Sequence, residues 1–320
     1  MSTAYQKVMD SRQETVNDLI AMIESEGMFN NKSAWTSHNL LPYNPETEVK
    51  YKGINKLKLM LCVMANGYAD PRFCTFKQLQ SAGYKLEKGA KGVLCEKWIM
   101  PNETLARMSV EKRLKMTQEE IDEFLKKPPK VSFFYVYNIS QVKKYPALNR
   151  EKVEEMTPDD LTKLADKLIR SSECPVYEQE LQGRAYYLPS KDEIHIPTRN
   201  VFKSSEAFIG TLLHEMGHST GHETRLNRNM KGEFGSPSYA KEELIVELST
   251  LFTNADLGIA PSKEQFEDTS DYLQSWLKGE NPKELFSIIK ESDKVSERIV
   301  SNYSKKMIKT LPKEKAKGAR

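Results

Sequence analysis

The sequence predicts two α+β domains, the second a small mixed sheet over a helix with a candidate metal site, followed by further helices. Three observations support this prediction. The chain of 320 residues and 36.8 kDa is long enough for two domains. Residues 50–98 are strongly basic, whereas most of the remaining chain is acidic. Helix-like and strand-like segments also occur together in both halves.

The N-terminal half begins with a helical pattern over residues 1–30, followed by a polar, turn-rich stretch. An apolar segment over 54–65 predicts a helix ended by Asn66-Gly67, and 75–82 predicts a short helix ending near Gly83. Two segments rich in β formers, 92–99 and 131–139, predict strands that pair with each other.

A charged insertion, residues 101–130, separates these two strands. We expect a helix over residues 117–127, because Thr117 can act as its N-cap and Glu120 can complete a capping box. Residues 1–147, including this insertion, are therefore predicted to form the first domain.

A polar segment with two prolines, residues 143–160, predicts the boundary to a second domain over 155–310. Residues 185–196 predict a hairpin that turns at Pro189–Asp192. The predicted helices cover residues 161–171, 204–220, 239–256, 271–277 and 282–303. The lysine-rich tail, 311–320, is expected to be disordered.

Charge and composition restrict the class of protein. Residues 50–98 contain ten basic and three acidic side chains, a net charge of +7, which indicates a region that binds a polyanion. The longest apolar run, 59–65, is far shorter than the roughly 20 residues of a membrane span. With no signal-peptide pattern and four cysteines outside any CxxC pair, we expect a cytoplasmic protein without membrane contact.

The motif His214-Glu215-Met216-Gly217-His218 lies within an apolar helical segment. Residues i and i+4 share a helix face, so His214 and His218 can bind one metal ion, for which zinc is the expected choice. Other divalent metals are possible. Glu215, rotated by about 100°, can reach a water molecule at this ion and act as general base in peptide hydrolysis.

A third metal ligand has two possible sources. A histidine six residues after His218 is excluded because position 224 is Thr224, although Gly221 matches a glycine expected between them. The alternative is a glutamate of the next helix, which contains Glu242, Glu243 and Glu247. We predict Glu243 as the ligand and Glu247, four residues later, as the acid that supports a histidine.

Further roles near the metal are less constrained by the pattern. Gly221 is expected to end the helix in the left-handed conformation, so that His222 is a ligand, a transition-state donor or a helix-terminal histidine. Tyr239 and Arg225 are the other candidates for stabilising a transition state. The strand before the helix is expected to present an edge for an extended peptide, with His195 facing solvent.

Several separated motifs resemble the ArdC-type antirestriction proteins. Those in the N-terminal half resemble the family's domain that binds single-stranded DNA: Ala34–Ser37, Tyr51–Asn55, Gly67–Phe73, Thr75–Gln78, Lys88–Gly92 and Tyr135–Asn138 with Gln141. Those in the C-terminal half resemble its zincin-like metallopeptidase domain: Leu213–His222, Arg225–Arg228, Tyr239–Leu244 and Ala255–Ile259.

This resemblance implies an antirestriction protein of a bacterial mobile element that binds single-stranded DNA and travels with transferred DNA. Lysines and aromatic side chains, which contact phosphates and stack on bases, are the candidate DNA ligands: Trp35, Tyr51, Lys52, Asn55, Tyr68, Arg72, Lys77, Lys85, Lys88 and Lys91. The alternative is an aromatic core beneath a solvated lysine face. The insertion 101–130 and the lysine-rich tail depart from the family pattern.

Three functions fit these motifs. The protein either binds DNA and hydrolyses peptide bonds, or binds DNA around a purely structural metal, or uses its basic half only to target a peptidase to a DNA-bound protein. Glu215 favours catalysis, because a structural metal site needs no general base. The expected partners are single-stranded DNA and a host restriction enzyme or other protein substrate.

Overall fold

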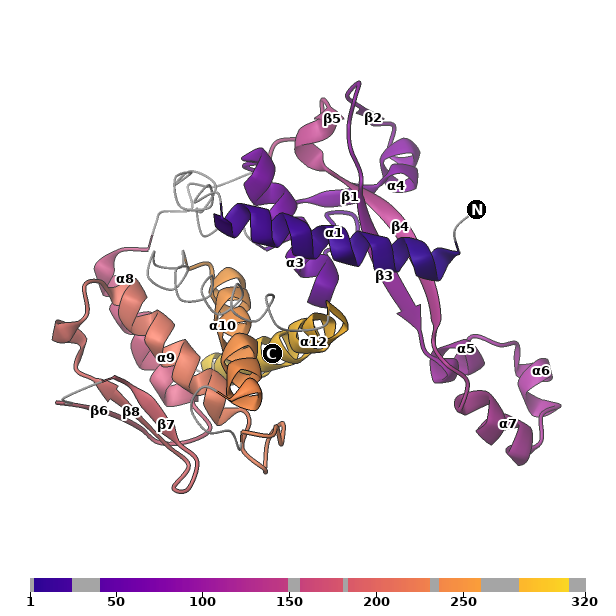
Figure 1. Cartoon of the computed structure of the whole chain (residues 1–320). Helices are drawn as coiled ribbons and strands as arrows, with labels where there is room; N and C mark the ends of the chain where they lie inside the picture. The colour runs from indigo at the N-terminus through magenta and orange to yellow at the C-terminus, as the bar shows by residue number, and fades with distance from the viewer. Residues whose placement is uncertain are drawn as a thin grey trace, which may run out of the picture.

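The computed structural model describes residues 3–24, 41–148, 156–180, 184–230, 236–259 and 282–310. Within them the chain forms the two α+β parts that the sequence predicts (Figure 1). Three predicted features lie outside the described residues: Trp35, the helix over 271–277 and the basic tail. None of the described helices is long and apolar enough to cross a membrane.

The N-terminal part contains a three-stranded antiparallel sheet in the order β1-β4-β3. The strands are β1 (Phe73–Thr75), β3 (Val93–Ile99) and β4 (Lys130–Asn138). The predicted pairing of the segments 92–99 and 131–139 is confirmed, because β3 and β4 pair along the whole of β3. β1 was not predicted, since three residues are too few to establish an alternating pattern.

Helix α3 (Gly53–Asn66) packs its apolar face against this sheet and contributes Leu59 and Val63 to the core. It ends as predicted, because Gly67 adopts the left-handed conformation with a φ of 60°. α3 also lies along the edge of β3 that has no neighbouring strand in the described part of the chain. The Asn55 amide exchanges two hydrogen bonds of 2.8 and 2.9 Å with the Glu96 backbone, so an edge that would otherwise invite pairing is satisfied.

Helix α1 (Ala4–Glu24) lies beside α3 and β3 and buries Val8 and Val16. Its Arg12 forms a two-bond ion pair with the buried Glu96 of β3. Such bidentate guanidinium–carboxylate contacts are geometrically specific, so this pair fixes the position of the helix on the sheet.

The far end of the N-terminal part is built from α4 (Phe76–Ser81), β2 (Lys85–Leu86), the short 3-10 helix Ile139–Gln141 and β5 (Val142–Lys143). α4 is the short helix that the sequence predicts, and Thr75 and Gln78 form a capping box at its start. β2 and β5 pair antiparallel and place Lys85 directly opposite Lys143. This end, named the basic tip, is at the top of Figure 1.

The insertion between β3 and β4 forms three short helices, of which the sequence predicted only the last. They are α5 (Pro101–Ala106), α6 (Val110–Leu114) and α7 (Gln118–Leu125), and they project away from the sheet (Figure 1). The predicted capping box of Thr117 and Glu120 is present. The first two helices were missed because five or six residues with no buried side chain leave no periodic apolar pattern.

The C-terminal part contains a mixed sheet in the order β6-β8-β7. The predicted hairpin corresponds to β7 (Tyr186–Leu188) and β8 (Glu193–Pro197). β6 (Val176–Gln179) was not predicted and pairs with β8 in parallel. The expectation that residues 192–197 form an edge is therefore wrong: β8 is central, because β6, which follows the helix α8 (Pro158–Ser171), pairs with the side of β8 that β7 leaves open.

Helices cover one face of this small sheet. α9 (Ser205–Ser219) follows β8 through the 3-10 turn Arg199–Val201, and α10 (Pro237–Leu257) packs against it. α12 (Pro282–Thr310) then runs along α10 and α8. Their apolar sides bury a continuous core that includes Leu213, Leu244 and Ile288.

The prediction that Gly221 ends the helix in the left-handed conformation is wrong. α9 ends at Ser219, Thr220 keeps a right-handed conformation, and Gly221 is not among the glycines with positive φ. The space around Gly221 is instead filled by neighbouring side chains. A Cβ atom at this position would lie 2.5 Å from the Met230 sulfur and 3.1 Å from the Arg228 guanidinium.

Helix α3 joins the two parts by packing against α10 and α12. Leu57 and Met60 of α3 belong to the same apolar core as the C-terminal helices. The buried Lys56 ammonium lies 2.8 Å from Asp256 of α10 and 3.6 Å from Asp293 of α12. Asp293 also accepts a 2.9 Å hydrogen bond from the Gly53 amide at the start of α3.

Candidate functional site

The candidate metal site begins on α9, which presents both motif histidines on one face. The Ser204 side chain caps this helix by accepting a hydrogen bond from the Ala207 amide. Gly217 lets α10 approach closely, since a Cβ atom there would meet Val246 at 2.9 Å. The two helices are therefore close enough for side chains of α10 to meet His214 and His218.

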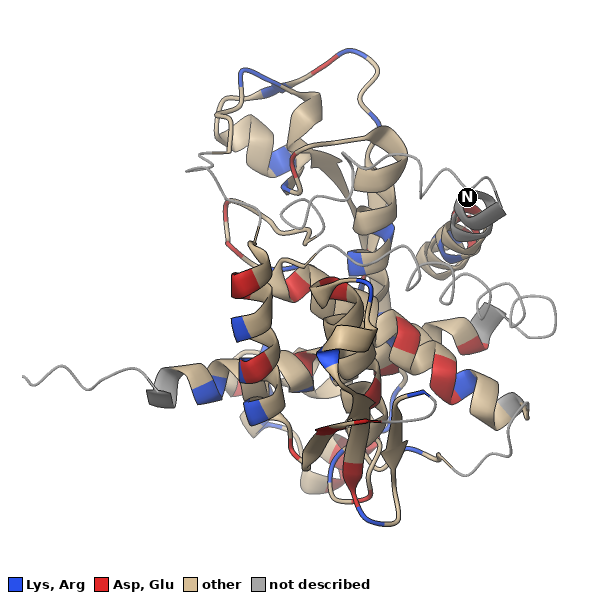
Figure 2. Ribbon diagram, turned by 90° about the vertical axis from the view of Figure 1, so that its left-hand side faces the viewer, with Lys and Arg blue, Asp and Glu red and all other residues tan. Residues whose placement is uncertain are grey.

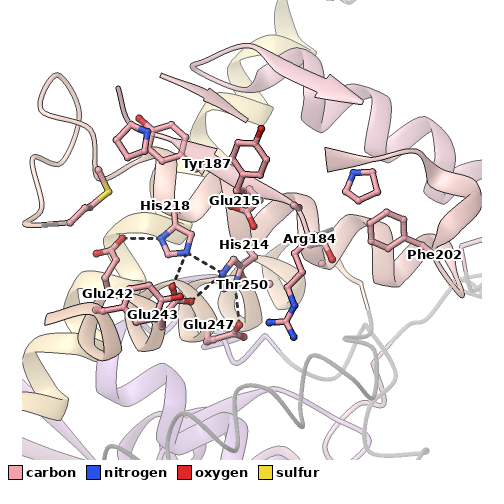
Figure 3. A pocket seen from close by; sticks show the side chains of 18 of the residues that line it. Arg184, Tyr187, Phe202, His214, Glu215, His218, Glu242, Glu243, Glu247 and Thr250 are labelled. Carbon is pink, nitrogen blue, oxygen red and sulfur yellow. Dashed lines mark hydrogen bonds and ion pairs between the residues drawn. The ribbon is translucent and has the colours of Figure 1, made fainter. Parts of the chain in front are cut away.

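Three side chains of these two helices converge on one point (Figure 3). The His214 and His218 Nε2 atoms are 3.1 Å apart. The Glu243 carboxylate lies 3.4 Å from His214 Nε2 and 3.6 Å from His218 Nε2. Ligands about 2.05 Å from zinc in a tetrahedral site are separated by roughly 3.3 Å, so these distances fit one small divalent ion.

The outer nitrogens of both histidines face further carboxylates. His214 Nδ1 is 2.9 Å from Glu247, and His218 Nδ1 is 3.4 Å from Glu242. When each Nδ1–H donates to its carboxylate, both Nε2 atoms are lone-pair acceptors that face each other and the negative Glu243. Three acceptors in contact repel one another, so this arrangement favours a cation between them, as in a metal site.

Electrostatics at Glu243 agree with this arrangement. Burial alone would raise the pKa of Glu243, but the close approach of His214 and His218 outweighs it and holds the pKa well below its usual value. The carboxylate is thus ionised at neutral pH, as a metal ligand must be.

Glu242 and Arg228 form a supporting pair that the sequence did not reveal. Arg228 donates to both Glu242 oxygens at 2.7 and 2.9 Å and also to the Gly217 carbonyl at 2.9 Å. Both side chains are more than nine-tenths buried. The pair orients His218. In the sequence, Arg228 was marked only by the Arg225–Arg228 motif and had no predicted role of its own.

Glu215 is buried on the same helix and lines the pocket beside both histidines (Figure 3). Burial raises the pKa of its carboxyl group, while the nearby His214 and His218 lower it in part. A raised pKa brings a carboxylate closer to the value of an effective general base at neutral pH.

The pocket around this cluster has a volume of about 820 Å³. Its walls include the start of β7, the turn after β8, and α10, with Phe202 and Met230 among its apolar lining. Tyr239, a predicted transition-state candidate, also lines it. This volume is large enough for a few residues of a peptide.

Two other candidates lie elsewhere. The Arg225 guanidinium is buried and binds Asp192 and the Ser219 carbonyl, so it links the hairpin turn to the end of α9. His222 is 2.9 Å from the Thr224 hydroxyl and does not line the pocket. Neither side chain is directed at the metal cluster.

His195 is not solvent-facing as predicted. It does point away from the buried Ile194 and Ile196, but its ring is stacked between Tyr177 and Tyr186 with centroid distances of 5.3 and 4.9 Å. The neighbouring strands cover it, because β8 is the central strand. It is not part of the metal cluster.

Several candidate DNA ligands have structural contacts instead. Arg72 is buried, binds both Asp70 oxygens and the Pro146 carbonyl, and stacks on Tyr145. Asn55 completes the edge of β3. Tyr51 and Tyr68 pack against the core cluster of β1, β3 and β4, and Lys52 is paired with Glu297 of α12.

The remaining lysine candidates gather at the basic tip, where all four are exposed: Lys77, Lys85, Lys88 and Lys91. Lys143 and Lys144 of the neighbouring chain segment are also exposed at this tip, and the Lys143 ammonium lies 3.7 Å from Glu87. Blue Lys and Arg positions recur along this end of the molecule, at the top of Figure 2. Phe76 is 53% exposed beside them. Lys143 and Lys144 were missed because the pairing of β2 with β5 is not apparent in the sequence.

Comparison with known protein families matches both parts of the chain. Residues 9–149 match a model described as the N-terminal domain of the anti-restriction factor ArdC, and residues 163–287 match a zincin-like metallopeptidase model. Together the two matches give the chain an ArdC N-terminal domain followed by a zincin-like metallopeptidase domain. The metal cluster lies in its zincin-like part and the basic tip in its ArdC N-terminal part.

Solved structures agree with this assignment. The manganese-bound crystal structure of the antirestriction ArdC protein from plasmid R388 has a TM-score of 0.67 and 27% identity, covering 92% of this chain and 98% of that one. The metal-free structure of the same protein, with the same identity and coverage, has a TM-score of 0.68. A divalent metal therefore binds at least one member of this fold.

Relatives of known sequence include two larger proteins. Two Escherichia coli proteins named DNA primase TraC are 32% and 31% identical over 84% and 83% of this chain, which spans only 25% and 18% of their lengths. An uncharacterized Sinorhizobium fredii protein, y4eC, is 29% identical over 84% of this chain and 83% of its own length.

Proposed function

We propose that this chain is an antirestriction protein that binds single-stranded DNA and hydrolyses peptide bonds at a zinc site. The observation that carries the catalytic part is the convergence of two imidazole Nε2 atoms and one carboxylate on a single point. Two imidazoles and a carboxylate are a ligand set that suits zinc and leaves a coordination position open.

His214, His218 and Glu243 would hold the ion, and Glu247 and Glu242 would fix the two imidazoles through their Nδ1 atoms. A bound zinc ion supplies Lewis-acid polarisation of a carbonyl and acidification of water. Glu215 then accepts a proton from the attacking water and delivers it to the leaving amine. Its buried position keeps bulk water from competing for that proton.

The peptide would bind along β7. In the described part of the chain this strand is at an edge of the sheet order β6-β8-β7, and its residues line the pocket. Its unpaired backbone groups can hydrogen-bond an extended substrate by strand addition. This places peptide recognition on β7 instead of β8, where the sequence had suggested it.

Single-stranded DNA would bind at the basic tip. Lys85 and Lys143 lie directly opposite each other, so their positive charges can both face one bound anion. The six lysines can follow successive phosphates, while the exposed Phe76 offers a ring face for a base. Host restriction enzymes and other DNA-bound proteins are the corresponding candidate substrates.

The metal site is tested by elemental analysis of the zinc-loaded and dialysed wild type, Glu243→Ala, His218→Ala and Glu215→Gln. We expect near-stoichiometric zinc in the wild type and Glu215→Gln, and its loss in the other two variants. Hydrolysis of a mixed peptide library should stop in Glu215→Gln. A zinc-loaded wild type without peptidase activity would instead support the structural metal.

DNA binding is tested by replacing Lys85, Lys88 and Lys91 together with alanine and measuring affinity for an oligothymidylate at several salt concentrations. Three lost phosphate contacts should reduce the slope of log affinity against log salt by about 2. The matched control replaces the exposed Lys112, Lys115 and Lys126 of the insertion, which changes the net charge equally. Equal effects of both variants would contradict a site at the tip.

A further inference from the structure

Arg184 lines the metal pocket and has no role in the site described above. It lies two residues before the first residue of β7 and is exposed. In Figure 3 its side chain extends into the pocket, with the guanidinium on the side of Glu247 and Thr250. It is the only basic side chain among the described residues that line the pocket, apart from the two histidines.

Four other arginines of the C-terminal part have carboxylate partners. Arg199, Arg225, Arg228 and Arg298 each form an ion pair of 2.6 to 2.7 Å. Within the described residues Arg184 forms no hydrogen bond or ion pair, a property it shares with the exposed Arg170 on α8. A guanidinium directed into a pocket without a partner is available to a ligand.

The neighbouring acids do not occupy this guanidinium. Glu242 is neutralised by Arg228, Glu243 faces the two histidines, and Glu247 lies 2.9 Å from His214 Nδ1. The pocket thus has one uncommitted positive charge at its wall, next to the strand along which we place the peptide.

We propose that Arg184 is a specificity-determining residue that binds a carboxylate of the peptide substrate. This inference rests on the proposed peptidase function and names its substrate class: peptides with an acidic side chain or a free C-terminal carboxylate near the scissile bond. The planar guanidinium fork matches a carboxylate with two parallel hydrogen bonds. A substrate with a neutral amide at that position leaves Arg184 unpaired.

The test measures binding of metal-directed probes to the zinc-loaded full chain by calorimetry. The probes are hydroxamate-capped dipeptides: Leu-Ala amide as the neutral reference, Leu-Ala with a free C-terminus, and amidated Leu-Asp with its neutral isostere Leu-Asn. The hydroxamate anchors each probe at the metal, so differences report the carboxylate. Their ranking distinguishes a C-terminal from a side-chain carboxylate.

We expect the wild type to bind at least one acidic probe about 10- to 100-fold more tightly than its neutral counterpart. Arg184→Gln should abolish this preference without changing affinity for the neutral probes, and Arg184→Lys should retain part of it. Equal binding of acidic and neutral probes, or a preference that persists in Arg184→Gln, would overturn the role of Arg184 while leaving the metal site intact. Failure of every probe to bind would overturn the proposed peptidase site itself.

Discussion

Replacing Lys56 with methionine tests the interface between the two parts of the molecule. This change keeps most of the side-chain volume and removes a charge that is only 4% exposed. At an effective dielectric constant of about 20, charges 2.8 and 3.6 Å apart attract by roughly 6 and 5 kcal/mol. Desolvation offsets much of this, and loss of one partner from a buried pair typically costs about 3–5 kcal/mol.

We therefore expect Lys56→Met to lower the free energy of unfolding by about 3–5 kcal/mol, measured by guanidinium denaturation with circular dichroism and fluorescence. The matched control is Lys52→Ala, whose ion pair with Glu297 joins the same region to α12 but is largely exposed. That control should cost at most about 1 kcal/mol. Equal small losses in both variants would refute the reasoning.

The same variant has a predictable pH dependence. Burial raises the pKa of Asp293 above its usual value, and the nearby Lys56 opposes that increase. Without Lys56 the folded-state pKa rises further above the unfolded one, so the folded variant binds more protons as pH falls. The stability deficit of Lys56→Met should consequently shrink between pH 7 and pH 5.

Three further predictions follow from other contacts. Glu247→Gln should weaken zinc binding about 10- to 100-fold in chelator competition, because the support of His214 is lost; unchanged affinity would contradict it. Asn55→Leu should cost about 2–4 kcal/mol in urea denaturation, because two β3 backbone groups lose their partners. Burial raises the pKa of Cys74 and Cys95 to about 11 and about 12. Unfolded thiols titrate near 8.5, so stability should fall above about pH 8.5 more steeply in wild type than in the double alanine variant.

Local patterns were sufficient for the longer elements. The end of α3 at Gly67, the capping box of Thr117 and the pairing of β3 with β4 each follow from neighbouring residues. The short strands β1, β2, β5 and β6 were not predictable in this way. They have two to four residues, and each is stabilised by a partner distant in the sequence.

Recognition of the metal site needed both a local sequence pattern and the tertiary contacts between two helices. The spacing of His214 and His218 requires only one helix, so the sequence predicted this histidine pair directly.

For the candidate DNA ligands, residue type alone was not sufficient. Arg72 and Asn55 have suitable residue types, but contacts with Asp70, Pro146 and the β3 backbone occupy them.

By itself, the sequence determined the two α+β parts, the histidine pair of α9 with Glu215, and the unequal distribution of charge, because helical periodicity and composition are local properties. Tertiary structure alone decided that Arg228 holds Glu242 behind His218 and that β8 is central. It also decided that Lys143 completes the basic tip and that Lys56 is buried between Asp256 and Asp293. Those contacts join residues from separate elements, and only packing of the core determines which charges meet.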